Sequence, residues 1–260
     1  MTSAPDEEPD TLVERDGQVL VITINRPKQR NAMTLAVAES IARALDELDA
    51  DASLAVGVLA GAGGNFCAGM DLKRFLLGER PSIPGRGFGG LTESPPAKPL
   101  IAAVEGMALA GGFELVLACD MVIASESAQF GLPEVKRGLV ARAGGLLRLP
   151  QLLPRAIALE MILTGETITA NRAAQIGLVN GVVPEGTALV EAKRFATLIA
   201  LNAPLALQAS KQVVWESRLW PDNQMFSMQA TMTDSVFESQ DALEGARAFA
   251  EKRAPTWSGK

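Results

Sequence analysis

The sequence contains no histidine, no tyrosine and only two cysteines among its 260 residues. Histidine is the usual side chain for proton transfer near neutral pH, so acid–base chemistry here must use carboxylates, lysine, cysteine or backbone groups. Cys67 and Cys119 cannot form a disulfide framework, which suits a reducing cytoplasm. Without histidine no zinc-ligand spacing exists. The sequence therefore predicts no metal site and makes carboxylates the first candidates for catalysis.

Long hydrophobic runs and basic charge are also missing. No uncharged apolar stretch reaches the length of about 18 residues that a membrane-spanning helix needs. The net charge of -6 argues against nucleic acid or a membrane surface as a partner, since both attract basic proteins. The acidic, proline-containing segment 1–11 resembles neither a secretory nor a mitochondrial presequence. We expect it to be a disordered lead of a cytoplasmic protein.

The first half of the chain predicts an α/β class. Thr34 is placed to cap a helix that runs to about Asp49, with apolar residues on one face. Continuous apolar segments that alternate with such helices are typical of a parallel sheet covered on both faces. The expected strands are 18–24, 54–61, 99–106 and 120–125.

From Gly144 onward the pattern is largely helical, with one short strand in 177–184. The expected helices are 144–153, 154–163, 170–176, 187–202, 204–219, 222–238 and 240–253. Segment 77–97 is rich in glycine and proline, and its hydrophobic residues show no periodicity. It is therefore either a disordered insertion or a lid over a site.

A glycine-rich stretch, GAGGNFCAGMDLK (61–73), directly follows an expected strand. It does not fit a dinucleotide fingerprint, because Phe66 stands where the third glycine belongs, and it lacks the lysine of a P-loop. Such a stretch is most often only a turn. The functional alternative is that Ala68, Gly69 and Met70 present backbone N–H groups to a ligand.

A second glycine-rich turn, at Gly111 and Gly112, leads into a short helix. The free N–H groups at a helix N-terminus favour negative charge. One N–H from each glycine-rich turn would form an oxyanion hole. Glycines before a helix also serve tight packing, and this alternative stays open.

Two glutamates follow, Glu114 in the first turn of that helix and Glu134 after Pro133. Glu114 has an ordinary explanation as an acid that complements the helix dipole, and Glu134 has one as a solvated turn residue. An apolar wall of Phe113, Phe130 and Leu132 would instead raise their pKa toward the range useful for acid–base catalysis. Arg26, Lys28 and Lys73 could bind phosphates, although isolated basic residues near turns are usually solvated.

In combination these motifs resemble the crotonase, or enoyl-CoA hydratase/isomerase, superfamily. The resemblance covers the chain from about Leu12 to its end. The segments that carry it are NRPKQRNAM (25–33), GNFCAGMDLK (64–73), KPLIAAVEGMALAGGFELVLACDMVIAS (98–125), AQFGLPEVKRGL (128–139), AGGLLRLP (143–150), LTGETITANRAAQIGLVNGVVP (163–184) and AFAEKRAPTW (248–257).

The resemblance implies a spiral of ββα units in a core domain at 12–200, then a helical region at 201–260 that forms homotrimers or dimers of trimers. It implies an acyl-CoA thioester substrate, with coenzyme A as part of the substrate and no separate cofactor. By position, the oxyanion hole would be the N–H groups of Met70 and Gly111. The residues that would bind coenzyme A are Arg26, Lys28, Ala68, Asp71, Leu72, Lys73, Phe249 and Lys252, the last two possibly from a neighbouring subunit.

Glu114 and Glu134 match the two catalytic glutamates of the family, which favours an enoyl-CoA hydratase, a lyase of fatty acid β-oxidation. Glu134 would deliver the proton to C2 and Glu114 would activate water. Carnitinyl-CoA dehydratase and enoyl-CoA isomerase are the alternatives, and a non-catalytic acyl-CoA binding protein is a third. The chain departs from ordinary short-chain hydratases at Ala141 and Arg142, where those carry Pro-Gly. This departure leaves open which acyl group the substrate carries.

Overall fold

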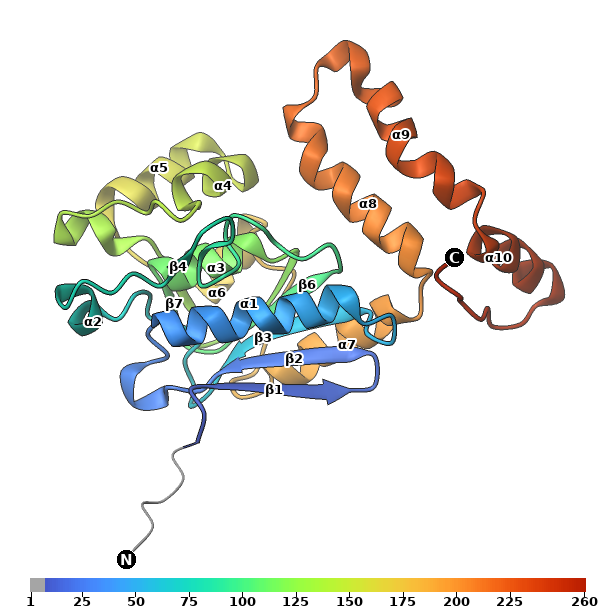
Figure 1. Cartoon of the computed structure of the whole chain (residues 1–260). Helices are drawn as coiled ribbons and strands as arrows, with labels where there is room; N and C mark the ends of the chain where they lie inside the picture. The colour runs from blue at the N-terminus through green and yellow to red at the C-terminus, as the bar shows by residue number, and fades with distance from the viewer. Residues whose placement is uncertain (1–7) are drawn as a thin grey trace, which may run out of the picture.

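The computed structural model describes residues 8–260, so most of the predicted lead lies outside the described residues. The fold is centred on a six-stranded sheet in the order β1-β2-β3-β6-β8-β11 (Figure 1). Only β1 runs antiparallel to its neighbour, and the other pairs are parallel. The strands are β1 (Thr11–Asp16), β2 (Val19–Ile24), β3 (Val56–Gly61), β6 (Leu100–Val104), β8 (Met121–Ser125) and β11 (Gly181–Val183).

Both faces of this sheet are covered by helices. Along β2, Leu20 and Ile22 point into a core that includes helix α1 (Leu35–Ala50), while Val19 and Val21 point into a second core with α7 (Ala188–Ala200). The alternation follows from the two-residue period of a strand. The predicted α/β class, the four apolar strands and the short strand in 177–184 are confirmed, with boundaries shifted by a few residues.

Helix α1 begins as predicted. The Thr34 side chain accepts a hydrogen bond from the N–H of Val37 at 3.3 Å, which satisfies one of the free donors of the first turn. The buried face of α1 carries Val37, Ile41, Leu45 and Leu48. This spacing of three or four residues gives a single apolar stripe.

A smaller sheet lies beside the main one and supports the turns at which the candidate residues lie. Its order is β10-β9-β7, with β7 (Met107–Leu109), β9 (Gln129–Gly131) and β10 (Ile168–Thr169). Strand β7 leads directly into α3 (Gly111–Ala118), and β9 leads into the 3-10 helix η2 (Pro133–Arg137). Because β7 and β9 pair in parallel, the segments that follow them emerge at the same edge.

Segment 77–97 is folded, so the alternative of a disordered insertion is wrong. It contains a hairpin of β4 (Ser82–Ile83) and β5 (Gly87–Phe88). Phe88 and Leu91 belong to the main core, and the Arg86 side chain donates to the Ala42 carbonyl of α1 at 3.0 Å. The segment is therefore held against the body of the protein by buried apolar groups.

Most of the remaining helices lie in the second half of the chain. The remaining helices are η1 (Pro27–Gln29) and α2 (Leu72–Leu76) in the N-terminal half, then α4 (Gly145–Leu152), α5 (Arg155–Thr164), α6 (Ala170–Gln175), α8 (Pro204–Glu216), η3 (Ser217–Leu219), η4 (Asp222–Gln224), α9 (Met225–Phe237) and α10 (Gln240–Glu251). The seven helices expected after Gly144 are all present. Helices α8 and α9 project from the core as a pair (Figure 1).

One partly buried polar cluster fastens α8 to the core. Asp120 accepts hydrogen bonds from Lys211 Nζ at 2.6 Å, Trp215 Nε1 at 2.8 Å and the Leu100 N–H at 2.8 Å. Both carboxylate oxygens are satisfied, and the charge of Lys211 compensates that of Asp120. Within residues 8–260 no helix combines the length and the apolar character needed to cross a membrane.

Candidate active site

The two glycine-rich turns predicted from the sequence lie next to each other. Cys67 pairs with Ala108, and Met70 pairs with Met33, each through an isolated β-bridge. A Cβ placed on Gly69 would lie only 3.3 Å from the backbone nitrogen of Gly111. The absence of a side chain at Gly69 therefore lets the two turns approach closely.

Each turn leaves at least one backbone N–H unused. Around Met70, the neighbouring Asp71 N–H donates to the Met33 carbonyl, but the Met70 N–H finds no protein acceptor among the described residues. The same holds for the N–H of Gly111, the first residue of α3. Two unpaired donors on adjacent turns are the groups that an oxyanion hole requires.

The turn before Gly111 is strained. Ala110 has a φ of 51°, a left-handed conformation that costs a non-glycine residue about 1–3 kcal/mol. The Ala110 N–H donates to the Gly131 carbonyl at 2.9 Å, and its carbonyl accepts from the Phe113 and Glu114 N–H groups. These bonds hold the strained residue and link the start of α3 to β9.

Phe88 of the hairpin packs end-on against the same turn. A Cβ placed on Gly111 would lie 2.4 Å from Phe88 Cζ. A glycine at position 111 thus allows tight packing against Phe88. The same residue presents a free N–H, so tight packing and N–H presentation, the two explanations considered from the sequence, are compatible. The hairpin in this way forms one wall beside the free N–H of Gly111.

Glu114 lies one turn into α3 and is only 3% exposed. Its Oε1 accepts the N–H of Gly145 at 2.9 Å, so the start of α4 fixes the carboxylate. Burial raises the pKa of Glu114 to about 7, and the negative charge of Glu134 adds to the rise, while the N–H groups of Gly145 and Ala143 and the charge of Arg148 oppose it. The carboxyl group therefore titrates near neutral pH.

Glu134, in the first turn of η2, is 8% exposed. Its Oε2 is buried and has no hydrogen-bond partner among the described residues. Burial also raises the pKa of this carboxyl group. An unsatisfied buried carboxylate oxygen is costly unless it meets water, a proton or a ligand. The expectation that Glu134 is a solvated turn residue is therefore wrong.

The three apolar residues predicted to form a wall beside the glutamates lie in the interior of the protein. Phe113, Phe130 and Leu132 are fully buried, and the two phenyl rings lie 5.6 Å apart between centroids. They belong to the main core. Desolvation by burial is the largest cause of the raised pKa of both Glu114 and Glu134.

The residues matched to coenzyme A binding near the N-terminus fall into two groups. Arg26 forms ion pairs with Asp71 at 3.2 Å and Asp10 at 3.3 Å, and its side chain is only 10% exposed. Asp71 also caps α2 by accepting the N–H of Lys73 at 3.1 Å. Their charges are thus used within the protein, although a role toward coenzyme A stays a prediction.

The second group is open to solvent. Lys28, Leu72 and Lys73 are exposed, and Ala68 is partly exposed. Ala68 and Leu72 flank Met70, so a ligand whose oxygen reaches the Met70 N–H would pass beside them. Lys28 and Lys73 lie on separate short helices, η1 and α2. Both remain candidates for contacts with phosphate.

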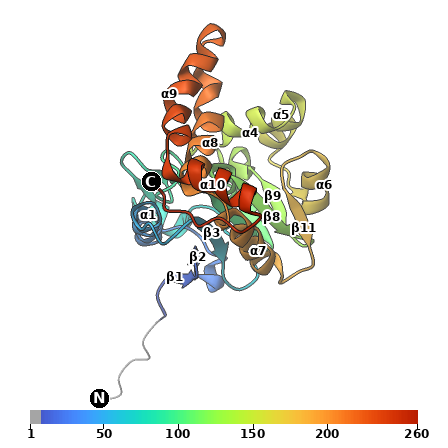
Figure 2. The ribbon, with the colours of Figure 1, turned by 90° about the vertical axis from the view of Figure 1, so that its right-hand side faces the viewer.

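Phe249 and Lys252 are not brought to this site within one chain. They lie at the C-terminal end of α10 and are exposed, Phe249 by 88%. Figure 1 places α10 on the opposite side of the molecule from α2, and Figure 2 shows α10 from the side that lies at the right in Figure 1. Contact with a ligand at Met70 would therefore require a second copy of the chain, as the resemblance allowed.

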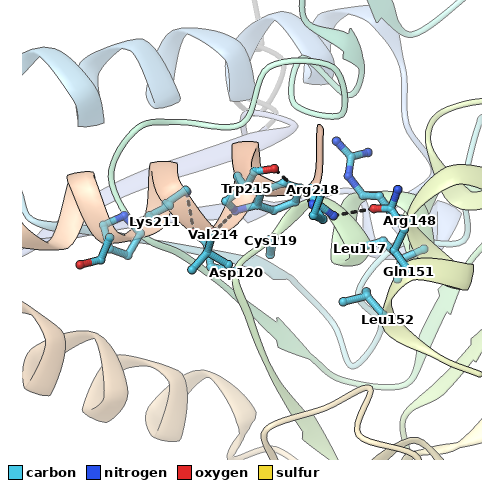
Figure 3. Close-up of a pocket in the computed structure, with 12 residues that line it drawn as sticks. Leu117, Cys119, Asp120, Arg148, Gln151, Leu152, Lys211, Val214, Trp215 and Arg218 are labelled. Atoms are coloured by element: carbon cyan, nitrogen blue, oxygen red, sulfur yellow. Dashed lines mark hydrogen bonds and ion pairs between the residues drawn. The ribbon is translucent and has the colours of Figure 1, made fainter. Parts of the chain in front are cut away.

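Sequence reasoning did not identify Gly145, Arg148 or Phe88. Gly145 and Arg148 lie in the motif AGGLLRLP, which suggested family membership but no contact. Cys67 and Cys119 are buried, and burial raises the pKa of both thiols. A pocket of about 430 Å³ lies between α8 and the core, with Arg148, Trp215 and Arg218 on its lining (Figure 3).

Comparison with known proteins assigns the chain to a family. The family model described as enoyl-CoA hydratase/isomerase matches residues 14–260. The chain belongs to the enoyl-CoA hydratase/isomerase family. The resemblance seen in the motifs is confirmed, and the chain is an enzyme of this family.

Two curated relatives of the enoyl-CoA hydratase/isomerase family carry different names. The chain is 42% identical over 97% of its length to enoyl-CoA hydratase EchA19 of Mycobacterium tuberculosis, and covers 97% of that protein. It is also 42% identical over 95% of its length to carnitinyl-CoA dehydratase of Salmonella typhi, of which it covers 97%. Identity alone therefore does not distinguish the two activities.

A solved family structure confirms the crotonase-type fold. The crystal structure of enoyl-CoA hydratase EchA1 from Mycobacterium marinum superposes with a TM-score of 0.96 at 55% identity, and the match covers 97% of this chain and 100% of that one. The expected α/β fold class is thus confirmed.

Proposed function

We propose that this enzyme adds water across the 2,3-double bond of a trans-2-enoyl-CoA thioester. The observation that carries the proposal is the buried Oε2 of Glu134, which lacks a partner in a site that also contains the buried carboxyl group of Glu114. A bound water between two carboxyl groups would satisfy that oxygen. Family membership supports the reaction class.

In the proposed reaction Glu114 and Glu134 together hold one water molecule. The water oxygen forms a bond to C3 while its proton passes to Glu114, and Glu134 gives its proton to C2. The electron pair of the double bond moves toward the thioester carbonyl in the transition state. The N–H groups of Met70 and Gly111 stabilise the resulting negative charge on that oxygen. The product is a 3-hydroxyacyl thioester, and proton exchange returns the pair to its starting state.

The raised pKa values of Glu114 and Glu134 suit their proposed roles as base and acid. General acid–base catalysis is most effective when the pKa of the group lies near the working pH. Glu114, with a pKa of about 7, is available in both states at neutral pH. Two coupled carboxyl groups in an apolar site readily share one proton, which leaves one acid and one base.

For the substrate, we place coenzyme A along Ala68, Leu72 and the exposed Lys28 and Lys73. The thioester oxygen would reach Met70 and Gly111. The proposed chemistry draws only on these protein groups and the thioester, so we propose that no separate cofactor is required. We assign the enzyme to fatty acid β-oxidation in the cytoplasm.

Carnitinyl-CoA dehydratase activity is the second candidate, because a relative of that name is equally identical to the chain. Its substrate carries an ammonium group, which aromatic or anionic side chains recognise. The aromatic side chain that lies nearest to a Cβ at Gly111 is that of Phe88. The positive charge of Arg148, which acts on Glu114, would repel a cationic acyl group. These features favour an uncharged enoyl chain.

The assembly we propose is a homotrimer or a dimer of trimers. Helices α8 and α9 contain no buried residue, and α9 begins and ends with exposed aromatic side chains, Phe226 at 85% and Phe237 at 80%. Contiguous exposed apolar groups mark an interaction surface. The separation of α10 from the site supports a second copy as the occupant, because it would bring Phe249 and Lys252 to coenzyme A.

The decisive experiment follows the enoyl absorbance of crotonyl-CoA, longer and branched enoyl thioesters, and crotonobetainyl-CoA. We expect steady turnover of uncharged enoyl thioesters and a loss of about a hundredfold or more in kcat for Glu134→Gln. Glu39→Gln, at an exposed glutamate of α1, is the control and should match the wild type.

Each negative outcome has a distinct meaning. If crotonobetainyl-CoA is turned over at least as well as crotonyl-CoA, the dehydratase is the correct activity. Full dependence on Glu134 with none on Glu114 would favour an isomerase, which needs one carboxylate. Binding of every thioester without turnover would identify a non-catalytic acyl-CoA binding protein and reject the proposal.

A further inference from the structure

Arg148 occupies an unusual electrostatic position. It lies in the first turn of α4, where the positive end of the helix dipole makes a cation unfavourable. The guanidinium of Arg218 adds a second positive charge, and burial together with Arg218 lowers the pKa of Arg148. Among residues 8–260 Arg148 forms no ion pair with a carboxylate, so this placement does not serve a simple salt bridge.

The contacts of Arg148 converge on groups next to the proposed catalytic pair. Its Nη2 donates to the Thr92 carbonyl at 2.6 Å, in the segment that also carries Phe88. Its side chain folds back over Gly144, where a Cβ would lie 2.2 Å from Arg148 Nη1. Gly144 has a φ of 108° and caps α4, so the guanidinium covers the turn that presents the Gly145 N–H to Glu114.

Arg148 also contacts the C-terminal helical region. Its Cζ lies 5.5 Å from the ring centroid of Trp215 on α8. Trp215 is held by Asp120, which fixes α8 on the core. Figure 3 shows Arg148, Trp215 and Arg218 around the pocket between α8 and α4. One side chain therefore touches α8, the hairpin segment and the α4 N-terminus.

We infer that Arg148 is a positioning residue: it holds the Gly144–Gly145 turn that orients Glu114 and thereby connects the C-terminal helical region to the catalytic pair. The inference rests on the proposed hydratase function and extends it to a residue that touches neither substrate nor water. The guanidinium acts in two ways, through its contacts and through its charge.

The charge has a defined effect on Glu114. The charged groups that face Glu114 are Glu134 from η2 and Arg148 from α4, together with the N–H groups of Gly145 and Ala143. Around Arg148 itself stand Glu114, Cys119 and Arg218. Removing Arg148 takes away a positive charge that lowers the pKa of Glu114, so this pKa should rise further.

The test compares Arg148→Lys, Arg148→Met and Arg218→Met with the wild type in steady-state hydration of crotonyl-CoA across pH. Arg218→Met is the matched control, because it removes the same charge from the same pocket without contacting Thr92 or Gly144. We expect Arg148→Met to lose between about tenfold and a hundredfold in kcat with a small change in KM. The acid limb of its pH–kcat profile should move to higher pH, because the pKa of Glu114 rises.

Arg148→Lys retains the charge but not the planar fork. It should lose kcat while its acid limb stays near that of the wild type. Arg218→Met should stay within about twofold of the wild type in kcat, as expected for a variant outside the site. If a folded Arg148→Lys or Arg148→Met has wild-type kcat and acid limb and only a lower Tm, Arg148 merely stabilises the fold and the inference is wrong.

A second measurement does not depend on turnover. The carboxyl carbon of Glu114, assigned by its loss in Glu114→Gln, can be titrated by ¹³C NMR in the wild type and in both Arg148 variants. The inference expects a higher pKa in Arg148→Met than in Arg148→Lys. Equal titration in all three proteins would overturn it. An inactive wild type that still shows the shift would reject the hydratase proposal alone.

Discussion

The backbone N–H of Gly145 donates to Glu114 Oε1 at 2.9 Å, so the start of α4 holds a carboxyl group that belongs to α3. Because the carboxyl group is buried, this hydrogen bond opposes the rise in its pKa that burial causes. The position of α4 thereby controls both the orientation and the proton affinity of Glu114. A substitution at Gly145 should consequently change activity by displacing the Glu114 carboxyl group.

Gly145→Ala tests this relationship. The added Cβ would lie 3.0 Å from Glu114 Oε1 and 3.1 Å from Leu132 Cδ1, so the carboxylate must shift. We expect kcat to fall about tenfold or more, whereas the helix propensity of alanine, up to about 1 kcal/mol better than that of glycine, should offset part of the steric cost to stability. Gly181→Ala, whose Cβ meets only Ile123 at 3.5 Å, is the kinetic control. Unchanged kcat in Gly145→Ala would contradict the assigned role of the turn.

The stability of the protein should depend on pH through Glu114. Its pKa rises from an ordinary value of 4.5 to about 7 on folding, so the folded state binds the proton more tightly than the unfolded state. This contribution is complete below pH 4.5 and is lost as pH rises through about 7. The Glu114→Gln variant has no such carboxyl group and therefore does not lose this stability as pH rises. Relative to the wild type its free energy of unfolding should be higher at pH 8 than at pH 4.5 by up to about 3 kcal/mol.

Urea unfolding at the two pH values measures this difference. Glu39→Gln serves as the control, because Glu39 is exposed and its substitution should leave the pH dependence of the wild type intact. A Glu114→Gln variant that retains the wild-type slope between pH 4.5 and pH 8 would show that Glu114 does not carry the raised pKa.

Phe88 and Gly111 should be energetically coupled. The ring occupies the space of a Cβ at Gly111, at 2.4 Å from Phe88 Cζ. Phe88→Ala alone should cost about 3–5 kcal/mol of stability by leaving a cavity, and Gly111→Ala alone should destabilise by steric overlap. In the double variant the new methyl group enters that cavity, so we expect it to be more stable than additivity predicts by about 1–3 kcal/mol.

A double-mutant cycle in thermal or urea unfolding provides the measurement. The cycle with Gly181→Ala in place of Gly111→Ala should be additive, because Phe88 is not among the nearest atoms at Gly181. Additivity in the Gly111 cycle would indicate that segment 77–97 does not pack on the turn at Gly111. This test is independent of any activity.

The sequence was sufficient for the elements whose patterns are local. The β2 alternation of Val19 and Val21 with Leu20 and Ile22 follows from burial on both faces, and Thr34 is recognisable as a helix cap. Strand β1 was not predicted, because its residues 13–16 are exposed and form a strand only by pairing with β2. The edge strand is specified by its partner rather than by its own composition.

The candidate site was only partly predictable for a similar reason. Glu114, Glu134, Met70 and Gly111 could be named because glycine-rich turns and acids at helix starts have recognisable local chemistry. The contacts of Phe88 with Gly111 and of Arg148 with Thr92 join positions that are far apart in the chain. No local pattern encodes such contacts. Segment 77–97 lacks periodicity, yet Phe88 and Leu91 bury it in the core.

The exposed aromatic side chains of α9 should determine the assembly. Phe226 is 85% exposed at the start of that helix, and Phe226→Asp would place a charge in the proposed interface, where an unpaired charge is costly. We expect wild-type protein to sediment as a trimer or a dimer of trimers and Phe226→Asp to shift toward monomer. Val190→Asp on α7, at a position 69% exposed, is the control and should keep the wild-type assembly.

The same variant links assembly to substrate binding. If Phe249 and Lys252 of one copy reach coenzyme A bound to another, the Phe226→Asp monomer should show a higher KM for crotonyl-CoA, because those contacts are lost. Phe249→Ala should raise KM in the assembled protein and leave it unchanged in the Phe226→Asp background. A monomeric wild type, or a Phe249→Ala effect of equal size in both backgrounds, would place these contacts within a single chain and contradict the proposed assembly.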